Sequence, residues 1–312
     1  MDDVLKNIDI ASLLEGNKNA QKRIGDQIVD AGETLGFFTI SGYESILPAD
    51  FIERSFDLSR AYFAKPDSVK LANEATEKMR FQGYEPPNDK DTKEAYIIGP
   101  ERSADDARVK KGDKYHGANQ WPADMPEFKA QFSDVTARML DLSRHLNRAL
   151  ALGLDAPKDY FDQRSKDPMC ALRMLHYAPS PAGEGRDGIA PHTDWGALSL
   201  LLQQDVSGLE VQRPDGTWFE VPARPDRIVV NLGELIARWT NDRLKATPHR
   251  VKPDVATDRY SIAFFLDMDA EAMIKTLSSC INNNKSSVYD PILVQSFIEQ
   301  MHKRDYPTQD VA

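Results

Sequence analysis

Residues 191–203 have the sequence PHTDWGALSLLLQ, in which a polar segment is followed directly by an apolar run. His192 and Asp194 are two positions apart, and residues two apart in an extended chain point to the same face. One imidazole and one carboxylate can therefore approach a single ion. The apolar run predicts a buried strand, which would hold this pair on a rigid element.

A second histidine, His249, lies in the segment KATPHRVKP, residues 245–253. An antiparallel β-barrel can bring segments that are distant in sequence side by side, so His249 can complete a set with His192 and Asp194. Two imidazoles and one carboxylate on one face of an ion form a facial triad. This triad leaves positions open for a cosubstrate and O₂ and is typical of iron(II). We therefore predict a metal site at these three residues.

A third segment, RYSIAFFLD at residues 259–267, predicts another buried strand. Arg259 and Ser261 share one face of it. A guanidinium fork beside a hydroxyl is suited to binding a carboxylate. A buried arginine also needs an anionic partner. The pattern therefore indicates a site for a carboxylate-bearing ligand.

The second half of the chain consists of short apolar segments separated by Gly, Pro and Asp. The tetrapeptide RPDG, residues 213–216, predicts a tight hairpin turn between two of them. Short strands at regular spacing are typical of an antiparallel sandwich or barrel. We therefore expect a β core over residues 169–270.

The remaining regions carry apolar residues at helical spacing. They predict helices over residues 19–35, 48–63, 126–152 and 291–303. The polar stretch 65–122 lacks such spacing and is expected to form long irregular connections. We expect one catalytic domain, residues 1–312, with a mostly helical part over 1–168, the core over 169–270 and a helical segment over 271–312.

Composition excludes several classes of protein. The chain has 39 Lys and Arg against 49 Asp and Glu, a formal net charge of -10, which argues against a nucleic-acid partner. Its two cysteines, Cys170 and Cys280, form no CxxC motif, which argues against a disulfide framework or a thiolate zinc site. No signal peptide or membrane-length apolar run is present, so we expect a cytoplasmic protein with no membrane partner. The oligomeric state stays open.

The segments PHTDWGALSLLLQ, GLEVQ, GTWFEVP, KATPHRV and DRYSIAFF, all within residues 191–265, resemble the iron(II)/2-oxoglutarate-dependent dioxygenases of the isopenicillin N synthase-like family. The H-x-D…H and R-x-S motifs follow one another in the family's order. GFFTISGY (36–43) and TKEAYIIGP (92–100) are similar to family segments further upstream. The resemblance implies a mixed fold with a β core, a double-stranded β-helix (jelly roll) flanked by α-helices.

The resemblance also implies roles for residues. It places iron(II) on His192, Asp194 and His249, and the distal carboxylate of 2-oxoglutarate on Arg259 and Ser261. Tyr177 matches a family tyrosine that can reach the same carboxylate. The sequence departs from the family pattern nearby, with Leu175 where many members carry Asn and Ala178 where many carry Pro. Asn231 and Asn241 match family positions that we interpret as structural.

The implied reaction uses O₂ and couples decarboxylation of 2-oxoglutarate to oxidation of a small molecule, by hydroxylation, desaturation or cyclisation. The motifs do not select among these outcomes. Arg80 and Arg238, near the expected mouth of the barrel, indicate an anionic substrate such as an amino acid or other small carboxylic acid. A secondary metabolite is also compatible with the resemblance. The candidate substrate contacts are Arg80, Phe81, Tyr84, Tyr96, Arg238, Trp239 and Phe264.

Two alternatives are left open by the residues. One is an iron-dependent oxidase of the same fold that uses O₂ without 2-oxoglutarate, because Arg259 and Ser261 are compatible with both activities. A succinate assay separates the two. The other is a non-catalytic jelly-roll binding protein, which the intact set of three ligand positions disfavours and which an iron-binding measurement would test.

Overall fold

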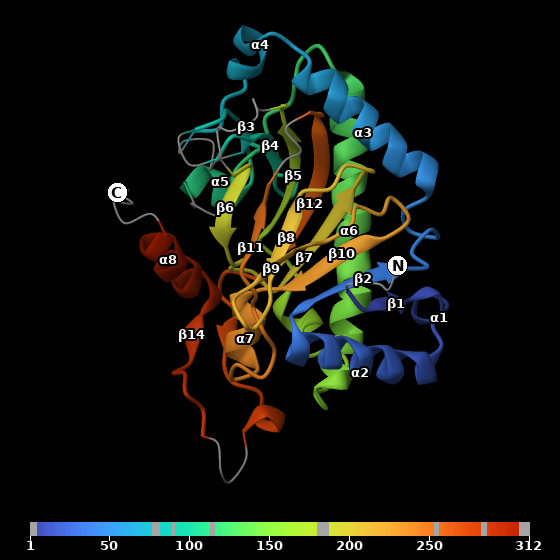
Figure 1. The fold of residues 1–312 in the computed structure, drawn as a ribbon. Coiled ribbons are helices and arrows are strands. Elements are labelled where there is room, and N and C mark those ends of the chain that lie inside the picture. Colours follow the sequence, from blue (N-terminus) through green and yellow to red (C-terminus); the bar gives the residue numbers. More distant parts are fainter. Residues whose placement is uncertain are drawn as a thin grey trace.

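Two β-sheets packed face to face form the centre of the molecule, and long helices cover the outer side of the larger sheet (Figure 1). The computed structural model describes residues 5–76, 82–88, 91–112, 116–179, 187–252, 256–281 and 286–305. The layering confirms the predicted double-stranded β-helix flanked by α-helices. None of the described helices has the length and apolar character that crossing a membrane requires.

The larger sheet has eight strands in the spatial order β1-β2-β10-β7-β12-β5-β4-β3. Neighbouring strands are antiparallel, except that β1 and β2 are parallel. The bounds are β1 (Asn7–Asp9), β2 (Phe37–Ser41), β3 (Gly83–Glu85), β4 (Glu94–Ile98), β5 (Cys170–Tyr177), β7 (Leu198–Gln203), β10 (Ile228–Leu232) and β12 (Arg259–Leu266).

This sheet crosses the boundary that we expected near residue 168, because β1 to β4 all precede it. The prediction of irregular connections over residues 65–122 was wrong in part. That stretch contains β3 and β4 and two short helices, α4 (Asp67–Leu71) and α5 (Ala107–Lys111). β4 is stabilised by pairing with β5, which lies far away in sequence, and local periodicity does not report such pairing.

The smaller sheet has four strands in the order β6-β11-β8-β9. They are β6 (Ile189–His192), β8 (Leu209–Gln212), β9 (Trp218–Glu220) and β11 (His249–Val251). The predicted hairpin at residues 213–216 is confirmed, with Gln212 opposite Trp218 and Gly216 at a φ of 85° that favours glycine. A separate ribbon pairs β13 (Met273–Ile274) with β14 (Ile292–Leu293).

The predicted helices are confirmed within a few residues. Besides α4 and α5 the structure has α1 (Ala11–Leu14), α2 (Lys18–Thr34), α3 (Ala49–Phe63), α6 (Pro126–Gly153), α7 (Glu234–Trp239) and α8 (Val294–Asp305), with 3-10 turns at Asp162–Arg164 and Ser278–Cys280. α8 begins later than predicted because Ile292 pairs with β13. Gly153 is the last residue of α6. Its backbone approaches that of Gly25 in α2 too closely for either residue to carry a Cβ atom.

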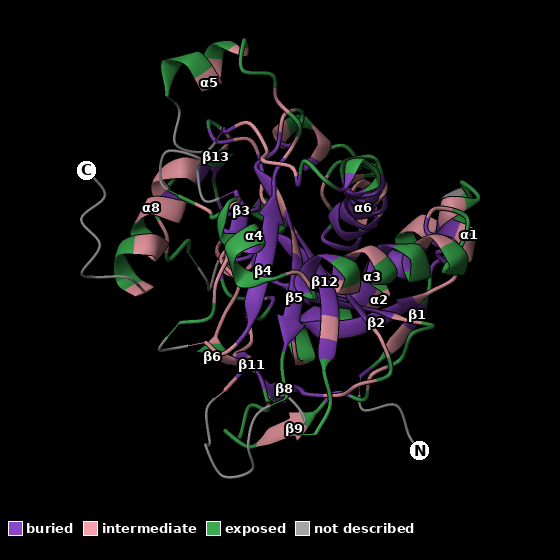
Figure 2. Cartoon of the chain, turned by 90° about the horizontal axis from the view of Figure 1, so that it is seen from above, coloured by how far each residue is buried: buried purple, intermediate pink, exposed green. Residues whose placement is uncertain are grey.

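Strands β4 and β5 of the larger sheet are buried along most of their length (Figure 2), and alternating residues of the sheet face two different environments. Even-numbered residues such as Leu172, Ile262 and Phe264 belong to the main hydrophobic core, together with residues of α2, α3 and α6. Odd-numbered residues such as Leu175 and Ala263 pack in a second cluster with Val251 of the smaller sheet. We call these the outer face and the inner face of the larger sheet.

Candidate metal centre

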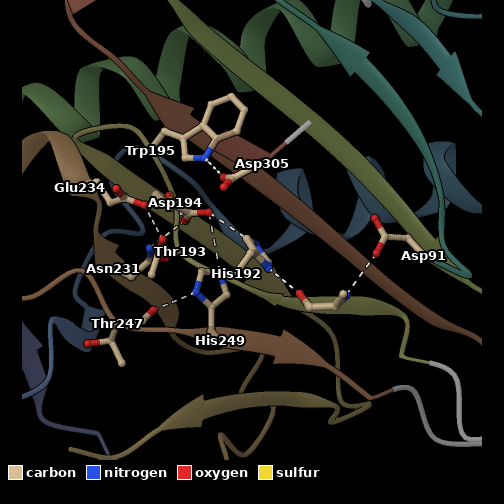
Figure 3. Close-up of polar contacts among 12 residues, drawn as sticks. Asp91, His192, Thr193, Asp194, Trp195, Asn231, Glu234, Thr247, His249 and Asp305 are labelled. Carbon is tan, nitrogen blue, oxygen red and sulfur yellow. Dashed lines mark hydrogen bonds and ion pairs between the residues drawn. The ribbon is translucent and has the colours of Figure 1, made fainter. Parts of the chain in front are cut away.

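Three side chains from the smaller sheet and the turn that follows it converge between the two sheets (Figure 3). His192 ends β6, Asp194 lies in the turn to β7, and His249 begins β11. β6 and β11 are neighbours, with His249 directly opposite His192. One ligand atom from each of the three residues lies within 4.8 Å of the others. The structure therefore brings together the three residues that the sequence predicts as a triad.

The two imidazoles are oriented by the backbone. His192 Nδ1 lies 2.8 Å from the Ala190 carbonyl oxygen, and His249 Nδ1 lies 3.2 Å from that of Thr247. A carbonyl oxygen only accepts, so each Nδ1 carries the hydrogen and donates it. Each Nε2 then presents a lone pair, and both Nε2 atoms lie 3.7 Å from Asp194 Oδ1.

Asp194 is held by two side chains of the larger sheet. Asn231 of β10 donates to Asp194 Oδ2 at 2.8 Å, and the Ser199 hydroxyl of β7 donates to the same oxygen. Oδ1 is thereby turned toward the imidazoles (Figure 3). Asn231 thus positions the carboxylate, a more specific role than the structural one that we predicted. Ser199 was missed, although its odd number places it on the same inner face.

Asn241 fits the structural interpretation. It adopts a φ of 56°, which asparagine tolerates better than most residues. Its side chain donates to the Ser286 carbonyl oxygen at 3.0 Å and accepts from the Val288 amide at 3.0 Å. It therefore ties the end of α7 to the segment that precedes α8.

The protonation states suit a divalent cation. Burial lowers the pKa of His249 to about 4, so that its imidazole is neutral near pH 7. Burial by itself would raise the pKa of Asp194, but His249, His192 and the hydrogen bonds from Asn231 and Ser199 hold it below its ordinary value. Neutral imidazole nitrogens and an ionised carboxylate are the donor set of non-haem iron(II). The residues present therefore fit this ion.

The three residues differ in exposure. The side chain of His192 is 37% exposed, against 8% for Asp194 and 10% for His249. Among the three residues, His192 is therefore the one most accessible to solvent.

A buried guanidinium lies in the same interior. Arg259 is 1% exposed, and its Nη2 donates to Gln203 Oε1 at 2.9 Å. Its Nη1 lies 3.5 Å from Ser261 Oγ, and its Cζ lies 4.8 Å from the centre of the Tyr177 ring. The structure therefore groups the three residues predicted to bind 2-oxoglutarate and adds Gln203, which the sequence analysis missed.

Arg259 has no carboxylate partner among the described residues, and its Nε atom is buried without a hydrogen bond. Burial lowers the pKa of this guanidinium, and Tyr177 offsets part of that effect. Leaving a buried charge without a counterion is costly. A ligand carboxylate would supply the missing charge.

Three of the predicted substrate contacts lie away from the triad. Tyr84, Tyr96 and Phe264 lie on the outer face and pack in the main core. All three have even numbers, and even-numbered residues of this sheet point toward the helices. The Tyr84 hydroxyl donates to Glu94 at 2.6 Å and the Tyr96 hydroxyl to the Gln120 carbonyl oxygen at 3.0 Å, so neither faces the triad.

The two candidates from α7 also lie elsewhere. Trp239 is fully buried, with its ring centre 5.6 Å from that of Phe161. Arg238 stacks over Tyr289 and donates to the Asp290 carbonyl oxygen at 2.8 Å. It lines a cavity of about 420 Å³ between α7 and α8, whose wall includes Thr193 between the ligands His192 and Asp194 but none of the three triad side chains. Arg80 and Phe81 lie outside the described residues.

The fold and the site define a class of protein: a double-stranded β-helix that carries a His-Asp-His set between its sheets and, on the inner face of the larger sheet, a buried arginine without a carboxylate partner among the described residues. A model of the 2OG-Fe(II) oxygenase superfamily matches residues 168–268. A model described as the non-haem dioxygenase in morphine synthesis N-terminal matches residues 5–124. The two matches cover the sheet strands on both sides of residue 168.

Individual relatives agree with these models. A 2-oxoglutarate-Fe(II) type oxidoreductase of Emericella nidulans is 33% identical over 302 residues, covering 92% of this chain and 86% of the relative. A 2-oxoglutarate-dependent dioxygenase of Monascus ruber is 36% identical over 290 residues, covering 86% of each. A full-length Neurospora crassa protein, crystallised in complex with alpha-KG and thymine, superimposes with a TM-score of 0.86 at 26% identity over 98% of both chains.

The chain belongs to the 2OG-Fe(II) oxygenase superfamily. This finding confirms the predicted enzyme class, an oxidoreductase that depends on iron(II), 2-oxoglutarate and O₂. It favours that class over an oxidase without 2-oxoglutarate and over a non-catalytic binding protein.

Proposed function

We propose that this protein oxidises a small organic molecule at an iron(II) ion held by His192, Asp194 and His249. 2-Oxoglutarate would lie between this ion and Arg259, with Ser261 and Tyr177 beside its distal carboxylate. The observation that carries the proposal is the buried Arg259 guanidinium, which faces the same interior as the triad and lacks a carboxylate partner among the described residues.

When bound, iron(II) supplies the oxidising chemistry that converts 2-oxoglutarate and O₂ to succinate and CO₂ and oxidises an unactivated C–H bond. The protein's own groups bind and orient. The two Nδ1–H donors fix the imidazoles, and Asn231 and Ser199 fix the carboxylate. Buried apolar residues of the inner face, Leu175 and Ala263 among them, exclude water from the reacting atoms.

The substrate is a small molecule in this proposal. The Neurospora relative, which binds thymine in its crystal structure, supports that size class. An amino acid or other small carboxylic acid, or a secondary metabolite, stays within it. A cytoplasmic location is likewise a proposal, supported by Cys170 and Cys280, which are buried and unbridged.

The test is an anaerobic titration of the purified protein with iron(II) and then 2-oxoglutarate, followed by visible absorption, with succinate measured after O₂ is admitted. We expect a new charge-transfer band that appears only with both components, and slow succinate release even without a primary substrate. Absence of both the band and succinate would overturn the proposal. Succinate release stimulated by a member of a metabolite panel would identify the substrate.

A further inference from the structure

A second arginine lies on the inner face, and neither the triad nor the cosubstrate site uses it. Arg173 is in β5, opposite Ala263 of β12 and Ile97 of β4. Ala263 and Ile97 both belong to the cluster between the sheets. Among the described strand residues of the inner face, Arg173 and Arg259 are the two guanidinium groups.

Among the described residues, Arg173 makes no polar contact that would account for its position. Its Cζ lies 5.2 Å from the centre of the Phe265 ring. Its Nε is buried and has no hydrogen-bond partner, and none of the described carboxylates forms an ion pair with it. The side chain is only partly exposed. Of the guanidinium nitrogens, only Nε is fully removed from water, and no acceptor of the described protein binds the group.

Two carboxylates, Glu85 and Asp267, interact electrostatically with Arg173, but neither forms an ion pair with it. Glu85 is taken by Lys93, with Oε1 2.7 Å from Nζ. Burial raises the pKa of Asp267 to about 7. The nearby charge of Asp194 adds to this rise, and that of Arg173 opposes it. Asp267 Oδ1 is a second buried polar atom without a hydrogen bond. Arg173 Nε and Asp267 Oδ1 are thus two buried polar atoms without hydrogen bonds to the described protein, in residues that interact electrostatically.

The position along the strands separates Arg173 from the cosubstrate anchor. Tyr177, which is opposite Arg259, lies four residues further along β5, about 13 Å at the usual rise per residue. In the other direction, Phe265 under the guanidinium pairs with Ser199, whose hydroxyl holds Asp194. Arg173 therefore lies toward the metal end of the interior, and Arg259 lies at the other end.

Building on the proposed function, we propose that Arg173 anchors the primary substrate by a carboxylate, with the Phe265 ring against a flat part of the same molecule. A guanidinium binds a carboxylate through two parallel charge-assisted hydrogen bonds, which fix orientation as well as position. Partial burial strengthens these bonds relative to water. The substrate class is thus a small planar carboxylic acid held close to the triad.

The test compares the parent protein with Arg173→Gln, Arg173→Lys and a control, Arg213→Gln. Arg213 also stacks on a phenylalanine, with Cζ 4.4 Å from the Phe219 ring centre, but it lies on the exposed hairpin. Calorimetric titrations are run anaerobically with iron(II) and saturating 2-oxoglutarate, which fills the Arg259 site. The probes are benzoate and cyclohexanecarboxylate, each against its primary amide.

We expect the parent to bind benzoate at least about 10-fold more tightly than benzamide, and the planar acid more tightly than the cyclohexane acid. Arg173→Gln should abolish the preference for acid over amide. Arg173→Lys should keep part of it, and Arg213→Gln should keep all of it. Should the Gln variant fail to fold, a reduced preference in the Lys variant is the required result.

Two outcomes overturn the inference: a parent that binds neither acid more tightly than its amide, or a folded Arg173→Gln variant that retains the preference. The charge-transfer titration with iron(II) and 2-oxoglutarate is run on every variant. If it fails in the parent, the proposed function fails with it. If it succeeds in the parent and weakens only in the Arg173 variants, Arg173 belongs to the cosubstrate site and the inference alone fails.

Discussion

The two faces of the eight-stranded sheet differ in whether their buried charged groups all have partners within the protein. On the outer face, His176 lies 2.7 Å from both Glu94 and Asp258, and Glu94 also accepts from Lys70 at 2.6 Å. Every charge in this network has a protein partner. On the inner face, Arg259 and Arg173 have no carboxylate partner among the described residues.

This difference separates stability from chemistry along the same strands. Buried polar groups in native proteins are normally hydrogen-bonded. The unpaired guanidinium groups of the inner face therefore indicate that a ligand binds there. The outer face packs against helices and is complete without one. A change of one residue along β12 or β5 therefore moves a side chain from the core to the site.

The largest expected effect comes from removing a triad residue. We expect His192→Ala, Asp194→Ala and His249→Ala each to reduce succinate formation to background, because each removes one of three protein ligands. The fold should persist, since none of the three belongs to the hydrophobic clusters. Succinate release with excess iron(II), with circular dichroism as the fold control, is the measurement. Near-parental turnover in one variant would remove that residue from the site.

The next effect concerns the cosubstrate anchor. Arg259→Leu should raise the KM for 2-oxoglutarate by about 30-fold or more, because a charge-assisted contact worth roughly 2–5 kcal/mol is lost. Arg259→Lys should be intermediate, since it keeps the charge without the fork. Iron affinity should barely change. A KM within about twofold of the parent, less than ~0.5 kcal/mol, would show that Arg259 is not the anchor.

A smaller effect is expected behind the metal. Asn231→Leu removes the 2.8 Å hydrogen bond to Asp194 Oδ2 but leaves the carboxylate in place. Loss of such a supporting contact typically costs about 10–100-fold in metal affinity or activity. Competitive iron titration against a chelator measures it, with the unfolding midpoint as a control. Parental affinity for iron would mean that Ser199 alone orients Asp194.

The sequence predicted the triad because its members are chemically distinctive and two of them lie two positions apart, although Asp194 falls in the turn after β6. It also predicted the grouping of Arg259 with Ser261, again two apart. It did not predict β4, whose stability comes from pairing with β5, nor the later start of α8, which depends on the pairing of Ile292 with β13. These contacts join segments that no local pattern connects.

The substrate face was mispredicted for a different reason. In RYSIAFFLD both faces of the strand are apolar, so hydrophobicity does not tell which side looks inward. The sequence nevertheless indicated which residues of this strand face inward, because Arg259 and Ser261 were already assigned to the ligand side and residues two apart share a face. Counting on by twos from Arg259 reaches Phe265, whereas the candidate named from the sequence was its neighbour Phe264. The same count on β5, from Tyr177, reaches Arg173.

The smallest effect on catalysis is expected for Phe264, whose even number places it on the outer face of the sheet, away from the site. Phe264 is fully buried in the main core, so Phe264→Ala should lower the free energy of unfolding by about 3–5 kcal/mol. The turnover of the molecules that stay folded should change little, because the outer face does not contact the reacting groups.

Phe265→Ala is the matched control. Phe265 is only partly buried, so it should lose no more than about 2 kcal/mol of stability while losing preference for planar acids. Denaturant unfolding and the benzoate titration on both variants make the comparison. If Phe264→Ala loses the acid preference and Phe265→Ala keeps it, the assignment of the two faces is reversed.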